Sequence, residues 1–133
     1  MKKGFAKLPR PTDAELAILG ALWRLGAASV REVLKELNRN RATKAGYTTV
    51  LKMLQIMTEK GLVSRDESQR PQIYRARLTE EQTQRQFVRD LLDRVFGGSA
   101  RKLVMSALAD KEASEKELQQ IEKLLDKLEG ESR

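Results

Sequence analysis

The chain has 133 residues, of which 40% are hydrophobic and 34% charged, a balance typical of a folded, soluble protein with one domain and an appendage. It contains no cysteine and no histidine, which excludes disulfides, thiolate nucleophiles, the commonest general base and the commonest metal ligands. The basic first residues precede no apolar run of signal-peptide or membrane-span length, so we expect a cytoplasmic protein without membrane insertion.

The net charge of +7 is unevenly distributed. Residues 1–79 carry 16 lysines and arginines against 7 acidic residues, a net +9, whereas residues 80–133 carry 10 against 12, a net −2. This asymmetry is typical of a nucleic-acid-binding domain joined to a tail with a different role. A basic surface that serves only solubility is the alternative that charge alone leaves open.

Four helix starts are marked by capping boxes, in which a Ser/Thr at the N-cap and a Glu/Gln three residues later satisfy backbone N–H groups. The apolar periods predict a helix over about 13–25 and another over about 30–38. Each should bury one stripe. The predicted capping boxes are Thr12/Glu15, Ser29/Glu32, Thr79/Gln82 and Ser114/Glu117, and the predicted stripes are Leu16, Leu19, Leu22 and Trp23, then Val30, Val33, Leu34 and Leu37.

A third helix is predicted over about 46–60, ending at Gly61, where glycine is a usual C-terminal cap. Its core stripe consists of Val50, Met53, Leu54 and Met57. Its outer side begins with Thr48 and Thr49, which helices tolerate but do not favour, and continues with Lys52.

Residues 62–66 and 72–78 have strand composition, and the intervening ESQRP has turn composition, with Arg70 at the tip. Alternation along the second strand places Arg75 on a basic face and Tyr74 on a core face. Three helices followed by a β-hairpin predict a winged helix-turn-helix over residues 1–78. The fold class is thus mainly α with a small β-hairpin, completed by a C-terminal helical domain over residues 79–133.

The C-terminal residues predict two or three further helices whose apolar stripes are too many for some 54 residues to bury alone. A second copy of the chain would supply the missing surface, so we expect a homodimer. The residues expected at the dimer contact are Phe87, Leu91, Val95, Phe96, Leu118, Ile121, Leu124, Leu125 and Leu128.

The recognition helix of a helix-turn-helix enters the major groove and presents its first residues to base edges. Threonine can hydrogen-bond there or contact a thymine methyl, and the flanking cations suit phosphates. The residues expected to bind DNA are Arg39, Arg41, Lys44, Tyr47, Thr48, Thr49, Lys52, Arg65, Arg70 and Arg75. The alternatives are a solvated helix face, a Tyr47 that packs on the core, and arginines that only protect a strand edge.

Three stretches of the sequence resemble the BlaI/MecI/CopY penicillinase-repressor family: PTDAELAILGALWRLGAASVREVLKEL, GYTTVLKMLQIMTEKGLV with IYRARLT, and FVRDLLDRVFGGSARKLVMSALA. The resemblance covers almost the whole chain. It implies a bacterial transcriptional repressor that binds a palindromic operator as a homodimer through the winged domain.

The resemblance also implies a mode of regulation, because members that control β-lactam resistance are inactivated when a membrane metalloprotease sensor triggers cleavage of the C-terminal domain. The Asn-Phe pair cleaved in those members aligns with Ser106-Ala107, which is chemically different. The copper-responsive members carry a cysteine cluster, and this chain has none. The inducing signal is therefore left open.

Two other functions compete with this interpretation. An enzyme would have to use carboxylate pairs such as Asp66/Glu67 or Asp110/Glu112, which lie in charged surroundings that do not tune a catalytic group, so we expect no enzyme. A winged helix that binds a protein or structured RNA is the second alternative. We expect no cofactor, no metal and no small-molecule substrate.

Overall fold

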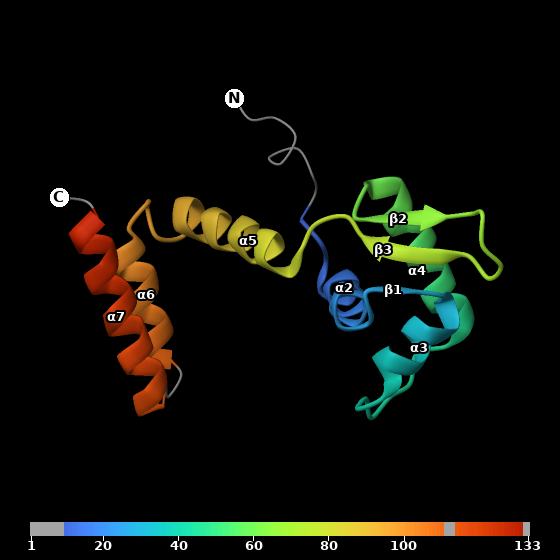
Figure 1. The fold of residues 1–133 in the computed structure, drawn as a ribbon, viewed down its shortest axis with the longest axis horizontal. Helices are drawn as coiled ribbons and strands as arrows, with labels where there is room; N and C mark the ends of the chain where they lie inside the picture. The colour runs from blue at the N-terminus through green and yellow to red at the C-terminus, as the bar shows by residue number, and fades with distance from the viewer. Residues whose placement is uncertain (1–9, 111–113, 132–133) are drawn as a thin grey trace. The chain divides into compact units, whose positions relative to one another are not determined.

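The computed structural model describes residues 10–110 and 114–131, with the side chains of 128–131 excepted. The described elements are α2 (Asp13–Leu25), β1 (Ala27–Ala28), α3 (Val30–Asn38), α4 (Tyr47–Lys60), β2 (Val63–Asp66), β3 (Ile73–Ala76), α5 (Glu80–Arg94), α6 (Ala100–Asp110) and α7 (Glu115–Glu131) (Figure 1). The chain divides into two compact units, residues 1–87 and 88–133, and the division falls inside α5. Among the described helices, none is both long enough and apolar enough to cross a membrane.

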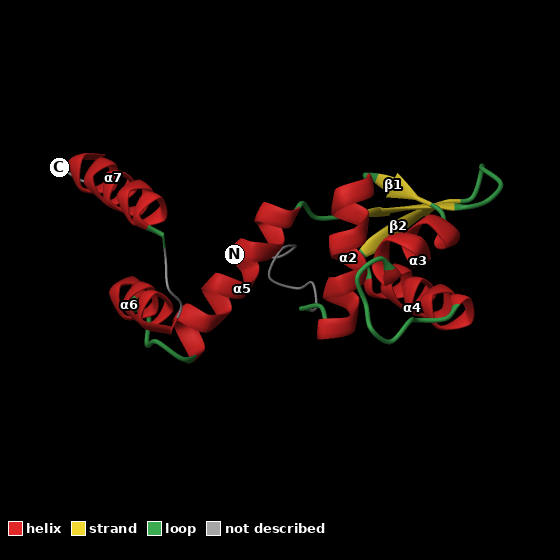
Figure 2. Ribbon diagram, turned by 90° about the horizontal axis from the view of Figure 1, so that it is seen from below, coloured by secondary structure: helices red, strands yellow, loops and turns green. Residues whose placement is uncertain are grey.

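The first unit is a three-helix core with a small antiparallel sheet on one side (Figure 2). The strands of the sheet follow the order β1-β3-β2 (Figure 1). Helix α2 packs on α3 and β3, and α4 packs on α3 and β2. The winged-helix prediction and the mainly α fold class are confirmed. The two hairpin strands are shorter than predicted, and the short strand β1 was not predicted.

The register of the sheet explains how a two-residue strand forms between two helices. Ala28 pairs with Tyr74 and Ala27 with Arg75, on the edge of β3 that β2 does not use. Two alanines give no alternation pattern, so their strand conformation depends on the pairing with a segment far along the sequence.

The predicted capping boxes form as hydrogen-bonded pairs. At the start of α2 the Glu15 N–H donates to Thr12 Oγ1 over 3.2 Å and the Thr12 N–H donates to Glu15 Oε1 over 2.9 Å. Equivalent pairs join Ser29 with Glu32, Thr79 with Gln82, and Ser114 with Glu117. Local sequence therefore determined where these helices start.

The core of the first unit is formed by aliphatic residues of all three helices and by Tyr74 of β3. Of the predicted stripe of α2, Leu19 and Leu22 are buried and Trp23 is half-buried and packs against the core. Leu16 is half-buried, and Ile18, which the prediction left out, is buried. The buried hydrophobic residues are Ile18, Leu19, Ala21, Leu22, Ala28, Val30, Val33, Val50, Leu54, Met57, Leu62, Val63 and Tyr74.

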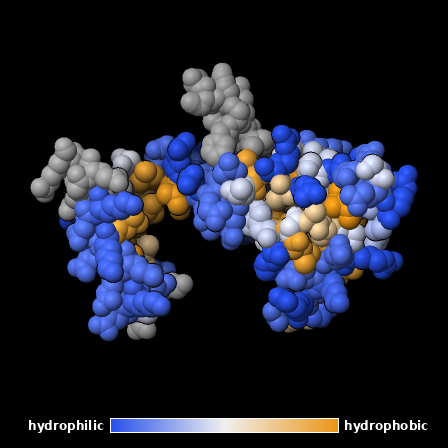
Figure 3. Space-filling model, viewed as in Figure 1, coloured by the Kyte–Doolittle hydropathy of each residue, from blue (hydrophilic) through white to orange (hydrophobic). Residues whose placement is uncertain are grey.

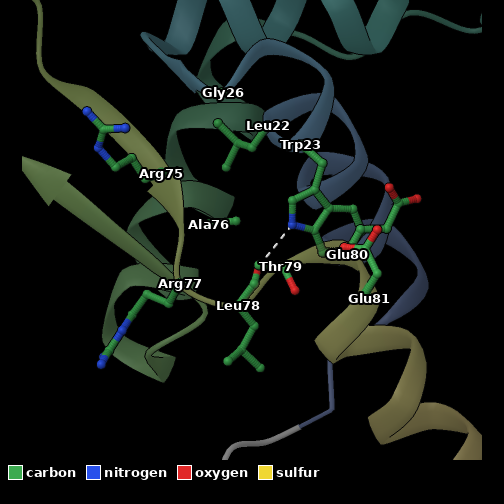
Figure 4. A pocket seen from close by; sticks show the side chains of 10 residues that line it. All are labelled: Leu22, Trp23, Gly26, Arg75, Ala76, Arg77, Leu78, Thr79, Glu80 and Glu81. Carbon is green, nitrogen blue, oxygen red and sulfur yellow. Dashed lines mark hydrogen bonds between the residues drawn. The ribbon is translucent and has the colours of Figure 1, made fainter.

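Trp23 packs at the edge of the core, where it also binds the segment that leaves the sheet. Its indole N–H donates a hydrogen bond to the Leu78 carbonyl oxygen over 3.0 Å (Figure 4). A cavity of about 360 Å³ beside this bond is lined by residues of α2, of β3, of the segment between β3 and α5, and of the start of α5, among them Arg75, Arg77 and Glu80. The bond attaches the segment between β3 and α5 to the end of α2.

Candidate nucleic-acid interface

Helix α4 buries one side and exposes the other. Val50, Leu54 and Met57 are buried, whereas Thr48, Thr49 and Lys52 are exposed. The turn before the helix ends at Gly46, which provides no side-chain cap, and the first helical turn contains no acidic residue. The N–H groups and the positive end of the helix dipole are thus left to interact with an anion.

The exposed surface of α4 has three strips, because each residue is rotated by about 100° from the previous one. Thr48 and Lys52 form the outermost strip. On one side Thr49 faces a groove of about 1000 Å³ that is also lined by α2 and by Arg41. On the other side Tyr47 faces the hairpin.

The loop before α4 is held by Asn38, a residue that sequence reasoning missed. The Asn38 Nδ2 donates to the Ala45 carbonyl over 2.9 Å, and the Ala45 N–H donates to Asn38 Oδ1 over 2.8 Å. The Lys44 Nζ donates to the Asn38 carbonyl over 2.6 Å. An asparagine at the end of a helix could have suggested such a bridge, since its amide can satisfy backbone groups in both directions.

The cations of this loop differ in their partners. Arg39 lies 3.1 Å from a Glu36 carboxylate oxygen, which also accepts a 2.6 Å hydrogen bond from Arg24 Nε. The Arg24 hydrogen bond, assisted by the charge of Arg39, lowers the pKa of Glu36. Arg41 is exposed. The structure thus brings Arg41 beside Thr49 of α4, whereas Lys44 and Arg39 bind the end of α3.

The hairpin places the two predicted strand arginines, Arg65 and Arg75, on opposite faces. Arg65 is paired with Tyr74 and Arg75 with Ser64, and residues opposite each other in a sheet share a face. Arg65 lies 2.6 Å from the Glu67 carboxylate, which raises the pKa of the guanidinium. The Arg75 side chain is exposed on the other face, so the strand arginines do not form one continuous basic surface.

The turn of the hairpin is ordered by Asp66, which accepts hydrogen bonds from Ser68 and Gln69. The Ser68 hydrogen bonds lower the pKa of the Asp66 carboxyl. Arg70 is exposed at the tip, and its Nη1 donates to the Glu67 carbonyl over 3.0 Å. Of the carboxylates that an enzyme would have to use, Asp66 stabilises this turn and Glu67 pairs with Arg65. Glu112 lies outside the described residues.

Arg31 of α3 also belongs to this region, although sequence reasoning missed it. Its guanidinium carbon lies 5.0 Å from the centroid of the Tyr47 ring. Tyr47 is 40% exposed, so it neither packs fully on the core nor stands alone in solvent. No periodicity indicates this contact, because the two residues belong to different helices.

The second unit exposes a large part of its apolar side chains. Helix α6 buries none of its residues, and Figure 3 shows apolar surface near α6 and the end of α5. The side chain of Leu128 lies outside the described residues. Exposed large hydrophobic residues in this unit are Val88, Leu91, Val95, Val104, Met105, Leu118, Leu124 and Leu125. Of the other residues expected at the dimer contact, Phe87, Phe96 and Ile121 are half-buried, and Phe87 lies in the first unit beneath the Arg10 guanidinium.

Acidic side chains of the described residues form no group that could hold a metal ion. The three helices and the small sheet give the described part of the first unit the features of a winged-helix protein, with cationic residues around the exposed side of α4.

The comparisons with known proteins agree with this class. The sequence model of the family described as penicillinase repressor matches residues 11–127, and the chain belongs to this family of bacterial transcriptional repressors. Over 120 residues the chain is 23% identical to the penicillinase repressor of Bacillus licheniformis, covering 90% of this chain and 92% of that protein. The family resemblance inferred from the sequence is confirmed.

Proposed function

We propose that this repressor binds a palindromic DNA operator as a homodimer. Helix α4 enters the major groove and the hairpin contacts the sugar–phosphate backbone. The observation that carries the proposal is the exposed polar strip of α4, formed by Thr48 and Lys52 on a helix whose opposite side is core. The uncapped N-terminus of α4 and the cationic loop before it favour the approach of phosphates. Two symmetric copies would meet half-sites roughly 34–36 Å apart, about one helical turn.

The roles of the cationic residues follow from their positions. Arg41 and Lys44 contact the backbone on the α2 side of α4, and Arg70 contacts it at the tip of the wing. Arg39, Arg65 and Arg75 contribute mainly to the long-range field, because Arg39 and Arg65 already have carboxylate partners and Arg75 lies on a separate face.

Thr48→Ala or Thr49→Ala is expected to weaken binding to the specific operator by about 1–3 kcal/mol and to change binding to random duplexes little. The reason is that a base-edge contact exists only on the cognate sequence. Fluorescence anisotropy with both duplexes measures the difference. Thr58→Ala is the matched control, since the Thr58 hydroxyl already donates to the Leu54 carbonyl at the far end of α4. Equal losses on both duplexes would refute base reading.

Arg70→Ala is expected to weaken binding to every duplex by a similar factor and to make the dependence of log K on log[salt] shallower by about 0.9, the value for one lost phosphate contact. Titrations at several salt concentrations measure the slope. An unchanged salt dependence would show that the wing tip does not contact a phosphate. A wild-type chain that showed no salt-dependent binding to any duplex would instead favour a protein-binding module.

We propose that relief of repression, if it occurs by proteolysis, acts on the second unit. Ser106 and Ala107, which align with the pair cleaved in related repressors, are exposed on α6. A helical segment must open before a protease can bind it in extended form, and α6, with no buried residue, has little packing to prevent that opening. A membrane metalloprotease sensor is the partner that such cleavage would require.

A further inference from the structure

A cavity of about 560 Å³ lies between the start of α3, the start of α4 and the hairpin turn. Its polar lining comes from three separate parts of the chain: Ser29 and Arg31, Tyr47, and Arg70 with Gln72. Tyr74, which is buried, also lines the cavity. No carboxylate lines this cavity in the described part of the chain, in contrast to the cavity beside Trp23, which includes Glu80 and Glu81.

The two arginines retain donors for an anion. The Arg31 guanidinium carbon lies over the Tyr47 ring, 5.0 Å from its centroid, and a cation–π contact does not use the guanidinium N–H groups as hydrogen-bond donors. Arg70 uses Nη1 to bind backbone carbonyls, which do not neutralise its charge. A guanidinium edge held in place by a ring is suited to a phosphate, which it can bind through two hydrogen bonds.

The cavity also lies where a DNA strand would pass. Tyr47 is adjacent on the helix to the outermost strip of Thr48 and Lys52, on the side that faces the hairpin. A helix in the major groove has one sugar–phosphate strand on each side, because the groove is about as wide as the helix with its side chains. The strand on the hairpin side would therefore run along this cavity.

We propose that Arg31, together with Tyr47 and Arg70, binds a backbone phosphate of duplex DNA on the hairpin side of α4. The proposal rests on the proposed DNA-binding function. It adds to that function a defined phosphate site and a residue, Arg31, that positions the recognition helix by holding the backbone.

The test compares the full-length wild-type chain with Arg31→Gln and with Arg85→Gln. Arg85 is exposed on α5 and does not line the cavity, so its replacement removes the same charge elsewhere. The probes are a duplex selected from a random pool by the wild-type chain and a duplex of scrambled sequence. Thermal unfolding by circular dichroism establishes that the variants are folded.

Arg31→Gln is expected to lower affinity for both duplexes roughly threefold to tenfold and to make the dependence of log K on log[salt] shallower by about 0.9. Arg85→Gln is expected to leave the affinity and the salt dependence nearly unchanged. Single uncharged methylphosphonate linkages placed along the selected duplex then locate the phosphate. One linkage should weaken the wild-type chain and leave Arg31→Gln unaffected, because the contact is already lost.

Three results would overturn the proposal in different ways. If the wild-type chain binds duplexes and Arg31→Gln matches it in affinity and salt dependence, the proposed phosphate site is wrong, but the proposed DNA-binding function is retained. If the wild-type chain binds no duplex, the proposed function fails and the site fails with it. Binding of free inorganic phosphate at Arg31, detected by NMR, without any effect of methylphosphonate linkages would assign the cavity to a small anion and also overturn the proposal.

Discussion

Replacing Ile121 and Leu125 of α7 by aspartate is expected to convert the proposed homodimer into monomers. Leu125 is 47% exposed and Ile121 is half-buried, and both belong to the apolar stripe of α7. If a second chain covers this stripe, each aspartate must lose its hydration without a partner, which costs several kcal/mol. We expect the dimer dissociation constant to rise by more than about a hundredfold, equivalent to about 2.7 kcal/mol.

Sedimentation velocity over a range of concentrations measures this change. The matched control replaces Gln119 and Gln120, exposed polar residues on the same helix, by aspartate and so adds the same charge outside the stripe. The control should remain dimeric. A tight dimer of the Ile121→Asp/Leu125→Asp variant would show that α7 is not at the subunit contact. Operator affinity should fall along with dimerisation, since each half-site would then be bound independently.

The second large effect is expected at Lys60, which joins the end of α4 to the start of α2. Its Nζ lies 2.7 Å from Glu15 Oε2, and the Glu15 side chain is only 6% exposed. Burial alone would raise the pKa of Glu15, but the hydrogen bonds from Lys60 and Thr12 outweigh it and lower the pKa. Lys60→Met would leave a buried carboxylate without its cation. We expect a loss of about 2–3 kcal/mol of unfolding free energy at neutral pH, because the Lys60 end is one-third exposed and partly screened.

The pH dependence of this loss has a definite sign. A carboxyl whose pKa is lowered by folding stabilises the native state above its ordinary pKa of 4.5, and the contribution disappears as the pH falls through the folded value. The difference between wild type and Lys60→Met should therefore narrow below about pH 4.5. Urea unfolding at a series of pH values measures it, with Lys35→Met on the exposed side of α3 as control. A difference that stayed constant down to pH 3 would exclude the ion pair as its cause.

The candidate interface was only partly predictable. Thr48 and Lys52 could be placed on the outer side of α4 because that side is defined by the local period of the core residues. Arg65 could be placed on the hairpin, but not its contact with Glu67 or its separation from Arg75 on the opposite face. No sequence pattern indicated a role for Arg31, because its contact with Tyr47 depends on how α3 crosses α4.

The sequence by itself determined the helices and the hairpin of this protein and the family to which it belongs. Helix starts at Thr12 and Ser29 and the stop at Gly61 follow from backbone groups that neighbouring residues satisfy. Only the tertiary structure decided the pairing of Ala28 with Tyr74, the ion pair between Glu15 and Lys60 and the cavity beside Arg31. These features depend on contacts between residues distant in the chain, and local periodicity does not predict which distant residues will be in contact.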